Sequence, residues 1–89
     1  MAVIEISVKL LTEDGLHARP AGVLVKVASQ FQAKVELTAN GITKNAKSIM
    51  SLMSMGLKGG EEILLKADGD DAAQAIETIK SLFESRFQE

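Results

Sequence analysis

The chain has 89 residues, of which 46% are hydrophobic and 25% are charged, and its formal net charge is −2. This composition is typical of a folded globular protein and excludes a disordered chain. The length predicts one domain over residues 1–89. Aromatic residues make up only 3% and the basic residues are scattered among carboxylates, so we expect no direct binding of nucleic acid.

The missing residue types exclude further classes of protein. The sequence has no cysteine and one histidine, which excludes disulfides and thiolate zinc sites, so we expect no metal and no other cofactor. No charged leader precedes a long apolar run, and no segment approaches the roughly 20 apolar residues of a membrane span. We therefore expect a cytoplasmic protein without membrane insertion, and a monomer.

The first half of the chain indicates a strand, a helix and a hairpin. Alternation from Ile4 to Leu10 is typical of a half-buried strand, and apolar residues then recur at helical spacing from Ala21 to Phe31. Asn40 and Gly41 tolerate positive φ and give a strong hairpin signal. These patterns predict a strand over 4–10, a helix over 18–30, and strands over 34–38 and 42–44.

The second half indicates a short helix, a strand and a long helix. Gly56 can end a helix over 48–55, the Gly59-Gly60 turn follows, and a strand is expected over 62–67. Asp70 or Asp71 can cap the last helix, whose apolar stripe consists of Ala72, Ala75, Ile76, Ile79, Leu82 and Phe83. The order βαββαβα predicts an α+β open-faced sandwich, with a four-stranded antiparallel sheet and three helices on one face.

The single histidine, His17, lies where the first strand gives way to the first helix. Gly15 permits a sharp turn, and Pro20 fits the first helical turn, where its missing N–H removes no hydrogen bond. His17 is therefore expected at or next to the N-cap. An imidazole there is a candidate phosphoryl acceptor, because free N–H groups and the helix dipole favour an anion. Arg19 can bind phosphate oxygens in a bidentate manner.

Two observations leave other roles open for His17. A lone histidine at this spacing also fits a helix cap or an ordinary surface side chain, and spacing alone does not decide between these roles. Asp14 could itself be the cap, and its charge would repel a phosphate on His17 if it pointed that way.

Two motifs carry a resemblance to a known family. Residues 15–21, GLHARPA, are similar to the active-site signature of HPr, the histidine-containing phosphocarrier of the sugar phosphotransferase system. Residues 45–50, NAKSIM, are similar to its second signature. Both occur in the family's order, and the similarity covers essentially the whole chain, including the Gly-rich turn before the last strand.

The resemblance implies a phosphoryl carrier without independent turnover. It implies that Nδ1 of His17 accepts a phosphoryl group from Enzyme I, originally from phosphoenolpyruvate, and that Arg19 stabilises it. The group then passes to the A component of a sugar permease. Asp14 stands where family members often have an uncharged polar residue, and Gly22 is intrinsically unfavourable inside a helix.

Ser48 has two expected roles. It is well placed as the N-cap of the short helix. The similarity to HPr proteins of Gram-positive bacteria implies that it is also phosphorylated by an HPr kinase/phosphorylase, and that this form is a corepressor for the catabolite control protein in carbon catabolite repression. A phosphate adds about two negative charges, which predicts weaker docking to Enzyme I without unfolding.

The short helix contains three of the four methionines. At about 3.6 residues per turn, Leu52 and Met55 share a side that can face the core, whereas Ile49, Met50 and Met53 gather on a partly exposed side. This side fits either a loosely packed core helix or a docking face for several partners. With the resemblance, partner binding is assigned to Ile49, Met50, Met53, Pro20 and Lys47.

Two other functions stay open. One is a regulatory adaptor or corepressor that acts mainly through phosphorylated Ser48, against which the presence of His17 argues. The other is a carrier for a nitrogen-linked branch of the same relay, although the Ser48 motif favours the carbon branch.

Overall fold

The computed structural model describes residues 2–87, so Met1 and residues 88–89, the ends of the expected 1–89 domain, lie outside it. Within the described part, the elements follow in the predicted order βαββαβα. They are β1 (Ala2–Lys9), α1 (Ala18–Ala28), β2 (Lys34–Ala39), β3 (Ile42–Asn45), α2 (Ile49–Met53), β4 (Glu62–Gly69) and α3 (Ala72–Glu84).

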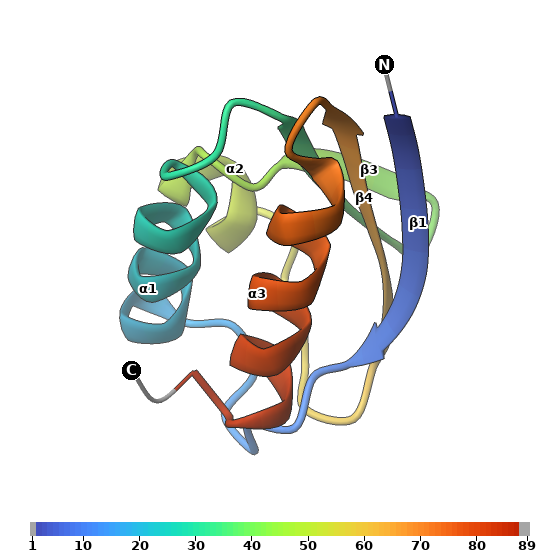
Figure 1. Cartoon of the computed structure of the whole chain (residues 1–89). Coiled ribbons are helices and arrows are strands. Elements are labelled where there is room, and N and C mark those ends of the chain that lie inside the picture. The colour runs from blue at the N-terminus through green and yellow to red at the C-terminus, as the bar shows by residue number, and fades with distance from the viewer. Residues whose placement is uncertain (1, 88–89) are drawn as a thin grey trace.

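The strands form the antiparallel sheet that the sequence predicts. Their spatial order is β1-β4-β2-β3, so β4 pairs with β1 on one side and with β2 on the other. The helices lie together on one side of this sheet (Figure 1). The open-faced sandwich is therefore confirmed.

The core lies between the sheet and the helices. Val35 and Leu37 of β2 and Leu65 of β4 are fully buried, while alternate residues of the same strands face outward. The predicted stripe of α3 is at most 7% exposed at each position and comprises Ala72, Ala75, Ile76, Ile79, Leu82 and Phe83. Burial of these side chains is the main force that holds α3 on the sheet.

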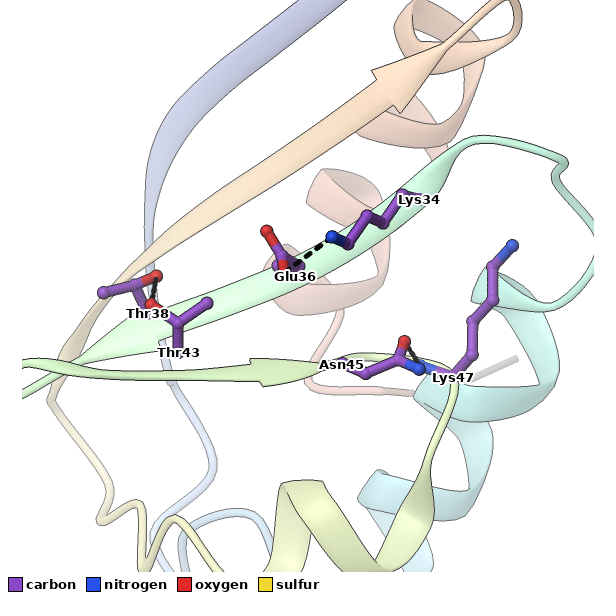
Figure 2. Close-up of polar contacts among 6 residues, drawn as sticks. All are labelled: Lys34, Glu36, Thr38, Thr43, Asn45 and Lys47. Carbon is purple, nitrogen blue, oxygen red and sulfur yellow. Dashed lines mark hydrogen bonds and ion pairs between the residues drawn. The ribbon is translucent and has the colours of Figure 1, made fainter.

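The opposite face of the sheet carries polar pairs (Figure 2). On β2, the Lys34 ammonium lies 3.5 Å from a Glu36 carboxylate oxygen. The hydroxyls of Thr38 and Thr43 lie 2.7 Å apart across β2 and β3. The turn between these strands has φ +53° at Asn40 and +78° at Gly41, which confirms the predicted hairpin.

The helices are shorter than predicted at their C-terminal ends. The helix expected over 18–30 ends at Ala28, and the one expected over 48–55 spans Ile49–Met53. In both, the closing hydrogen bonds tighten to a three-residue spacing, as from the Phe31 N–H to the Ala28 carbonyl and from the Gly56 N–H to the Met53 carbonyl. Phe31 therefore lies beyond α1 and is only partly buried.

All four strands differ from their predicted bounds, and those expected over 34–38 and 42–44 each extend by one residue, to Ala39 and Asn45. The strand expected over 4–10 runs from Ala2 to Lys9, and the one expected over 62–67 continues to Gly69. The reason is their pairing, in which Ala2 lies opposite Gly69 and Lys9 lies opposite Glu62.

The N-cap of α3 lies at a predicted residue, but the side chain of that residue does not cap the helix. Asp71 is the N-cap residue, yet among residues 2–87 its side chain makes no capping hydrogen bond. Its carboxylate oxygens instead accept hydrogen bonds from the backbone N–H groups of Gln32 and Ala33, each at 2.8 Å. The Gln32 N–H, supported by that of Ala33, lowers the pKa of the Asp71 carboxyl below its ordinary 3.8, against a smaller opposing effect of desolvation.

Candidate functional site

The loop before α1 holds His17 through contacts with a distant segment. The Thr12 hydroxyl donates to the Gly15 carbonyl at 2.9 Å, and the Gly15 N–H donates to the Thr12 carbonyl at 3.2 Å. The Leu16 N–H then donates to the Leu57 carbonyl at 3.3 Å. The loop is thus tied both to itself and to the segment between α2 and β4.

Gly15 is the residue that this arrangement requires. Its φ is +76°, and a Cβ atom there would overlap the carbonyl oxygen of Leu57. A side chain at this position is therefore disfavoured both by the backbone conformation and by the lack of space. The sequence predicts the turn at Gly15 but not its contact with Leu57.

His17 is the N-cap residue of α1, in the position that the sequence predicts, with φ −86° and ψ −171°. Its carbonyl accepts the Ala21 N–H at 3.0 Å, but within residues 2–87 its side chain makes no capping hydrogen bond. The N–H groups of Ala18 and Arg19 in the first turn have no helical acceptor, and Pro20 has no N–H. The exposed imidazole thus stands beside the positive end of the helix.

A pocket of about 300 Å³ opens at this end of α1. It brings together His17 and Arg19, as the sequence predicts, and shows that Asp14 does lie at the site. Its walls come from the loop before α1, the first turn of α1 and the segment after α3, and consist of Thr12, Glu13, Asp14, His17, Arg19, Pro20, Arg86 and Phe87.

Four of these residues, Thr12, Glu13, Arg86 and Phe87, are not site residues in the sequence-based prediction, and the last two lie far from His17 in the chain. The Phe87 N–H donates to the Leu82 carbonyl at 2.8 Å and the Arg86 N–H to the Phe83 carbonyl at 3.2 Å, which is the Schellman arrangement at a helix C-terminus. Arg86 takes φ +60° and Phe87 φ +63°, at a cost of about 1 kcal/mol or more each. Because the sequence has no glycine after Gly69, it carries no stop signal at the end of α3 that could have pointed to Arg86.

Ser48 caps α2 as predicted. Its hydroxyl oxygen accepts the Ser51 N–H at 3.3 Å. The chain reaches it through a turn in which the Asn45 side-chain oxygen accepts the Lys47 N–H at 2.9 Å (Figure 2), and the Ser48 N–H donates to the Asn45 carbonyl at 3.2 Å. Asn45 thus sets the conformation that delivers Ser48 to the helix start.

The short helix has the buried side and the exposed side that the sequence predicts. Leu52 is fully buried and Met55 nearly so, whereas Ile49, Met50 and Met53 are 38%, 78% and 45% exposed. We call these three residues the α2 apolar surface. It adjoins α1, because a Cβ atom on Gly22 would lie 3.8 Å from the Ile49 side chain.

The two other residues assigned to partner binding are placed differently. Pro20 is buried and contributes to the wall of the His17 pocket. The Lys47 ammonium donates to the Phe31 carbonyl at 2.7 Å, just beyond α1. Lys47 therefore already stabilises the chain where it leaves α1, besides any contact with a partner.

Residues 2–87 contain neither a membrane-spanning helix nor a cluster of side chains that could bind a metal ion. No helix there is long and apolar enough to cross a bilayer. In the same part of the chain, no three histidine, aspartate or glutamate side chains converge on a point that could hold a metal ion.

Comparison with known proteins gives one consistent family. A sequence model described as "PTS HPr component phosphorylation site" matches residues 4–85. The phosphocarrier protein HPr of Mycoplasma capricolum subsp. capricolum is 54% identical over 66 residues, 74% of each chain. That of Treponema pallidum is 41% identical over 93% of this chain and 94% of its own. The crystal structure of HPr-C-His from Thermoanaerobacter tengcongensis has a TM-score of 0.92 at 40% identity, with 97% of both chains covered. The chain therefore belongs to the HPr family, the phosphocarrier proteins of the phosphotransferase system.

Proposed function

We propose that His17 accepts a phosphoryl group from phosphorylated Enzyme I and passes it to the A components of sugar permeases. The observation that carries this proposal is the placement of the imidazole at the N-cap of α1 without a capping bond among the described residues. The unpaired N–H groups of the first turn and Arg19 in the same pocket supply donors for phosphate oxygens.

His17 is the nucleophile of this transfer, and Arg19 and the first-turn N–H groups bind the phosphate oxygens. The lone pair of a His17 ring nitrogen attacks phosphorus, and a P–N bond forms while the bond from phosphorus to the donor atom breaks and its electron pair stays on the donor. The other ring nitrogen keeps its proton. In the second transfer an acceptor atom attacks phosphorus, and the P–N bond breaks with its electron pair returning to the ring nitrogen. The imidazole is thus restored, which is why the chain acts as a carrier without turnover of its own.

Intact-mass measurement after incubation with Enzyme I and phosphoenolpyruvate tests this proposal. We expect one added phosphate that is lost in acid, and no acid-labile phosphate in His17→Ala. Absence of phosphate on the original chain, with a known carrier active in parallel, would sink the proposal. A regulatory adaptor that acts through phosphorylated Ser48 would then be the better account.

We also propose that phosphorylation of Ser48 by an HPr kinase/phosphorylase regulates this site and promotes binding to the catabolite control protein. The hydroxyl caps α2, and an anion at a helix N-terminus is locally tolerated. The added charge adjoins Ile49 and Met50, whose exposed apolar side chains suit a partner surface that is itself apolar. Docking therefore weakens although the fold stays intact.

The variant Ser48→Asp tests this regulation, since aspartate is also a good N-cap and adds a negative charge. We expect slower phosphoryl transfer from Enzyme I with an unchanged urea midpoint. Ser48→Ala is the matched control, because it loses the cap, at about 1 kcal/mol, without adding charge. Equal transfer rates in Ser48→Asp and the original chain would contradict the electrostatic account.

The α2 apolar surface, together with Pro20 and Lys47, is proposed as the docking region for these partners. Its support is the 78% exposure of Met50, since flexible thioethers adapt to different surfaces. Titration of isotope-labelled protein with Enzyme I should shift the amide NMR signals of α1 and α2. Leu64, which is 38% exposed on the polar face of the sheet, is the internal reference, and shifts centred on its strand would contradict the proposal.

A further inference from the structure

The charges around the His17 pocket balance only when Arg86 is counted. The walls include two acidic residues, Glu13 and Asp14, and two basic ones, Arg19 and Arg86. Arg19 alone would leave an excess of negative charge, to which a phosphoryl group adds about two more charges. Among residues 2–87, neither arginine forms an ion pair, so their N–H donors are available to a ligand.

The backbone places Arg86 at the pocket in a conformation that favours glycine. Its φ of +60° follows from its place in the turn that closes α3. Phe87 fixes this turn, because it is only 5% exposed and its ring packs edge-on against Phe83 with centroids 4.8 Å apart. Figure 1 shows the segment after α3 turning toward the first turn of α1.

We propose that Arg86 is a second phosphate-binding residue of this site and joins Arg19 in binding the phosphoryl group on His17. This inference rests on the proposed function of His17. A guanidinium group binds phosphate oxygens through two parallel N–H donors, and two such groups offset the carboxylates of Glu13 and Asp14. The acidic residue at position 14 is thereby compatible with an anion in the pocket.

The variant Arg86→Gly separates phosphate binding from folding. Glycine adopts the required φ without strain, so this variant should be at least as resistant to urea as the original chain, although it lacks the guanidinium. Arg86→Lys keeps the charge but not the planar pair of donors. Lys80→Gln is the matched control, because Lys80 is an exposed residue of α3 outside the pocket walls and its loss changes the net charge equally.

Each protein is equilibrated with Enzyme I at a ratio of phosphoenolpyruvate to pyruvate that leaves the original chain half phosphorylated, and intact mass gives the phosphorylated fraction. We expect the ratio of phosphorylated to unphosphorylated protein to fall about tenfold in Arg86→Gly, as for loss of one charge-assisted contact. Arg86→Lys should recover part of this loss, and Lys80→Gln should match the original chain.

The outcomes distinguish this inference from the proposal on which it rests. If Arg86→Gly is phosphorylated to the same extent as the original chain, the role of Arg86 is wrong and that of His17 stands. If Lys80→Gln loses as much as Arg86→Gly, the effect belongs to general surface charge and the inference is again wrong. If the original chain takes up no phosphate, both fail together.

Discussion

At the scale of single residues, the position of His17 depends on a glycine two places before it. Gly15 has φ +76°, and its Cα faces the carbonyl oxygen of Leu57, the same oxygen that accepts the Leu16 N–H. Space at this point is needed for the hydrogen bond that fixes the entry to α1. A glycine in an active-site signature here has a steric reason as well as a conformational one.

The variant Gly15→Ala should therefore lose stability and slow phosphoryl transfer. We expect the free energy of unfolding in urea to fall by about 2 kcal/mol or more, from left-handed strain and from displacement of the Leu57 segment. Gly60→Ala is the control, because Gly60 has φ +90° but open space around its Cα. A loss in Gly60→Ala as large as in Gly15→Ala would show that strain alone, without overlap, is responsible.

At the scale of elements, α1 contains a residue that weakens it without an evident packing need. Gly22 lies inside the helix, and a Cβ atom there would meet only the Ile49 side chain at 3.8 Å, an ordinary contact. Glycine inside a helix costs roughly 0.5–1 kcal/mol relative to alanine. The structure around Gly22 leaves room for the larger residue.

We therefore expect Gly22→Ala to raise the free energy of unfolding in urea by about 0.5–1 kcal/mol. The same substitution at Gly41, which has φ +78° and open space, should lower it, because the hairpin turn needs a left-handed residue. Opposite signs at the two glycines are the expected result. Destabilisation by Gly22→Ala would mean that α1 and α2 pack more tightly than these distances indicate.

The link between α3 and the loop before β2 makes the stability of the fold depend on pH. The Asp71 carboxylate accepts the N–H groups of Gln32 and Ala33, and its pKa lies below the ordinary 3.8. Because the unfolded chain binds this proton more readily, the carboxylate stabilises the fold above about pH 4. That contribution is lost as the pH falls through the lowered pKa of the folded state.

The variant Asp71→Asn removes the ionisable carboxyl group and should therefore weaken the dependence of stability on pH. An amide presents only one acceptor oxygen, and its NH₂ group would face a backbone donor. We expect a lower urea midpoint at pH 7 and a smaller further loss between pH 5 and 3 than in the original chain. Asp70→Asn, with the same change of charge at an exposed neighbour, should leave the midpoint at pH 7 unchanged. Equal acid sensitivity of Asp71→Asn and the original chain would contradict this account.

At the scale of the whole molecule, local patterns predicted the layers of the fold correctly. The alternation in β1 and the apolar stripe of α3 indicate which side of each element is buried. The Asn40-Gly41 turn indicates that the two strands beside it pair antiparallel. All three agree with one sheet covered on one face. The N-cap positions of His17 and Ser48 followed for the same reason. A helix start is encoded within a few residues of the chain.

The features that were missed depend on contacts between distant segments. Asp71 looked like a local cap, but its partners, Gln32 and Ala33, lie almost forty positions earlier in the chain. Arg86 reaches the His17 pocket only because the turn after α3 folds toward α1. A local pattern in the sequence does not show which distant segments come into contact, so these features could be found only from the structure.

The single histidine of this chain has a consequence for the timing of the relay. Under the function proposed for His17, donor and acceptor must both reach the same imidazole beside one pocket, so they cannot be bound together and must bind in turn. Each transfer is then a separate encounter, as in a ping-pong scheme, and throughput depends on how fast the carrier leaves one partner and diffuses to the next. For such a protein, tight binding to either partner would slow the relay, and brief contacts serve it best.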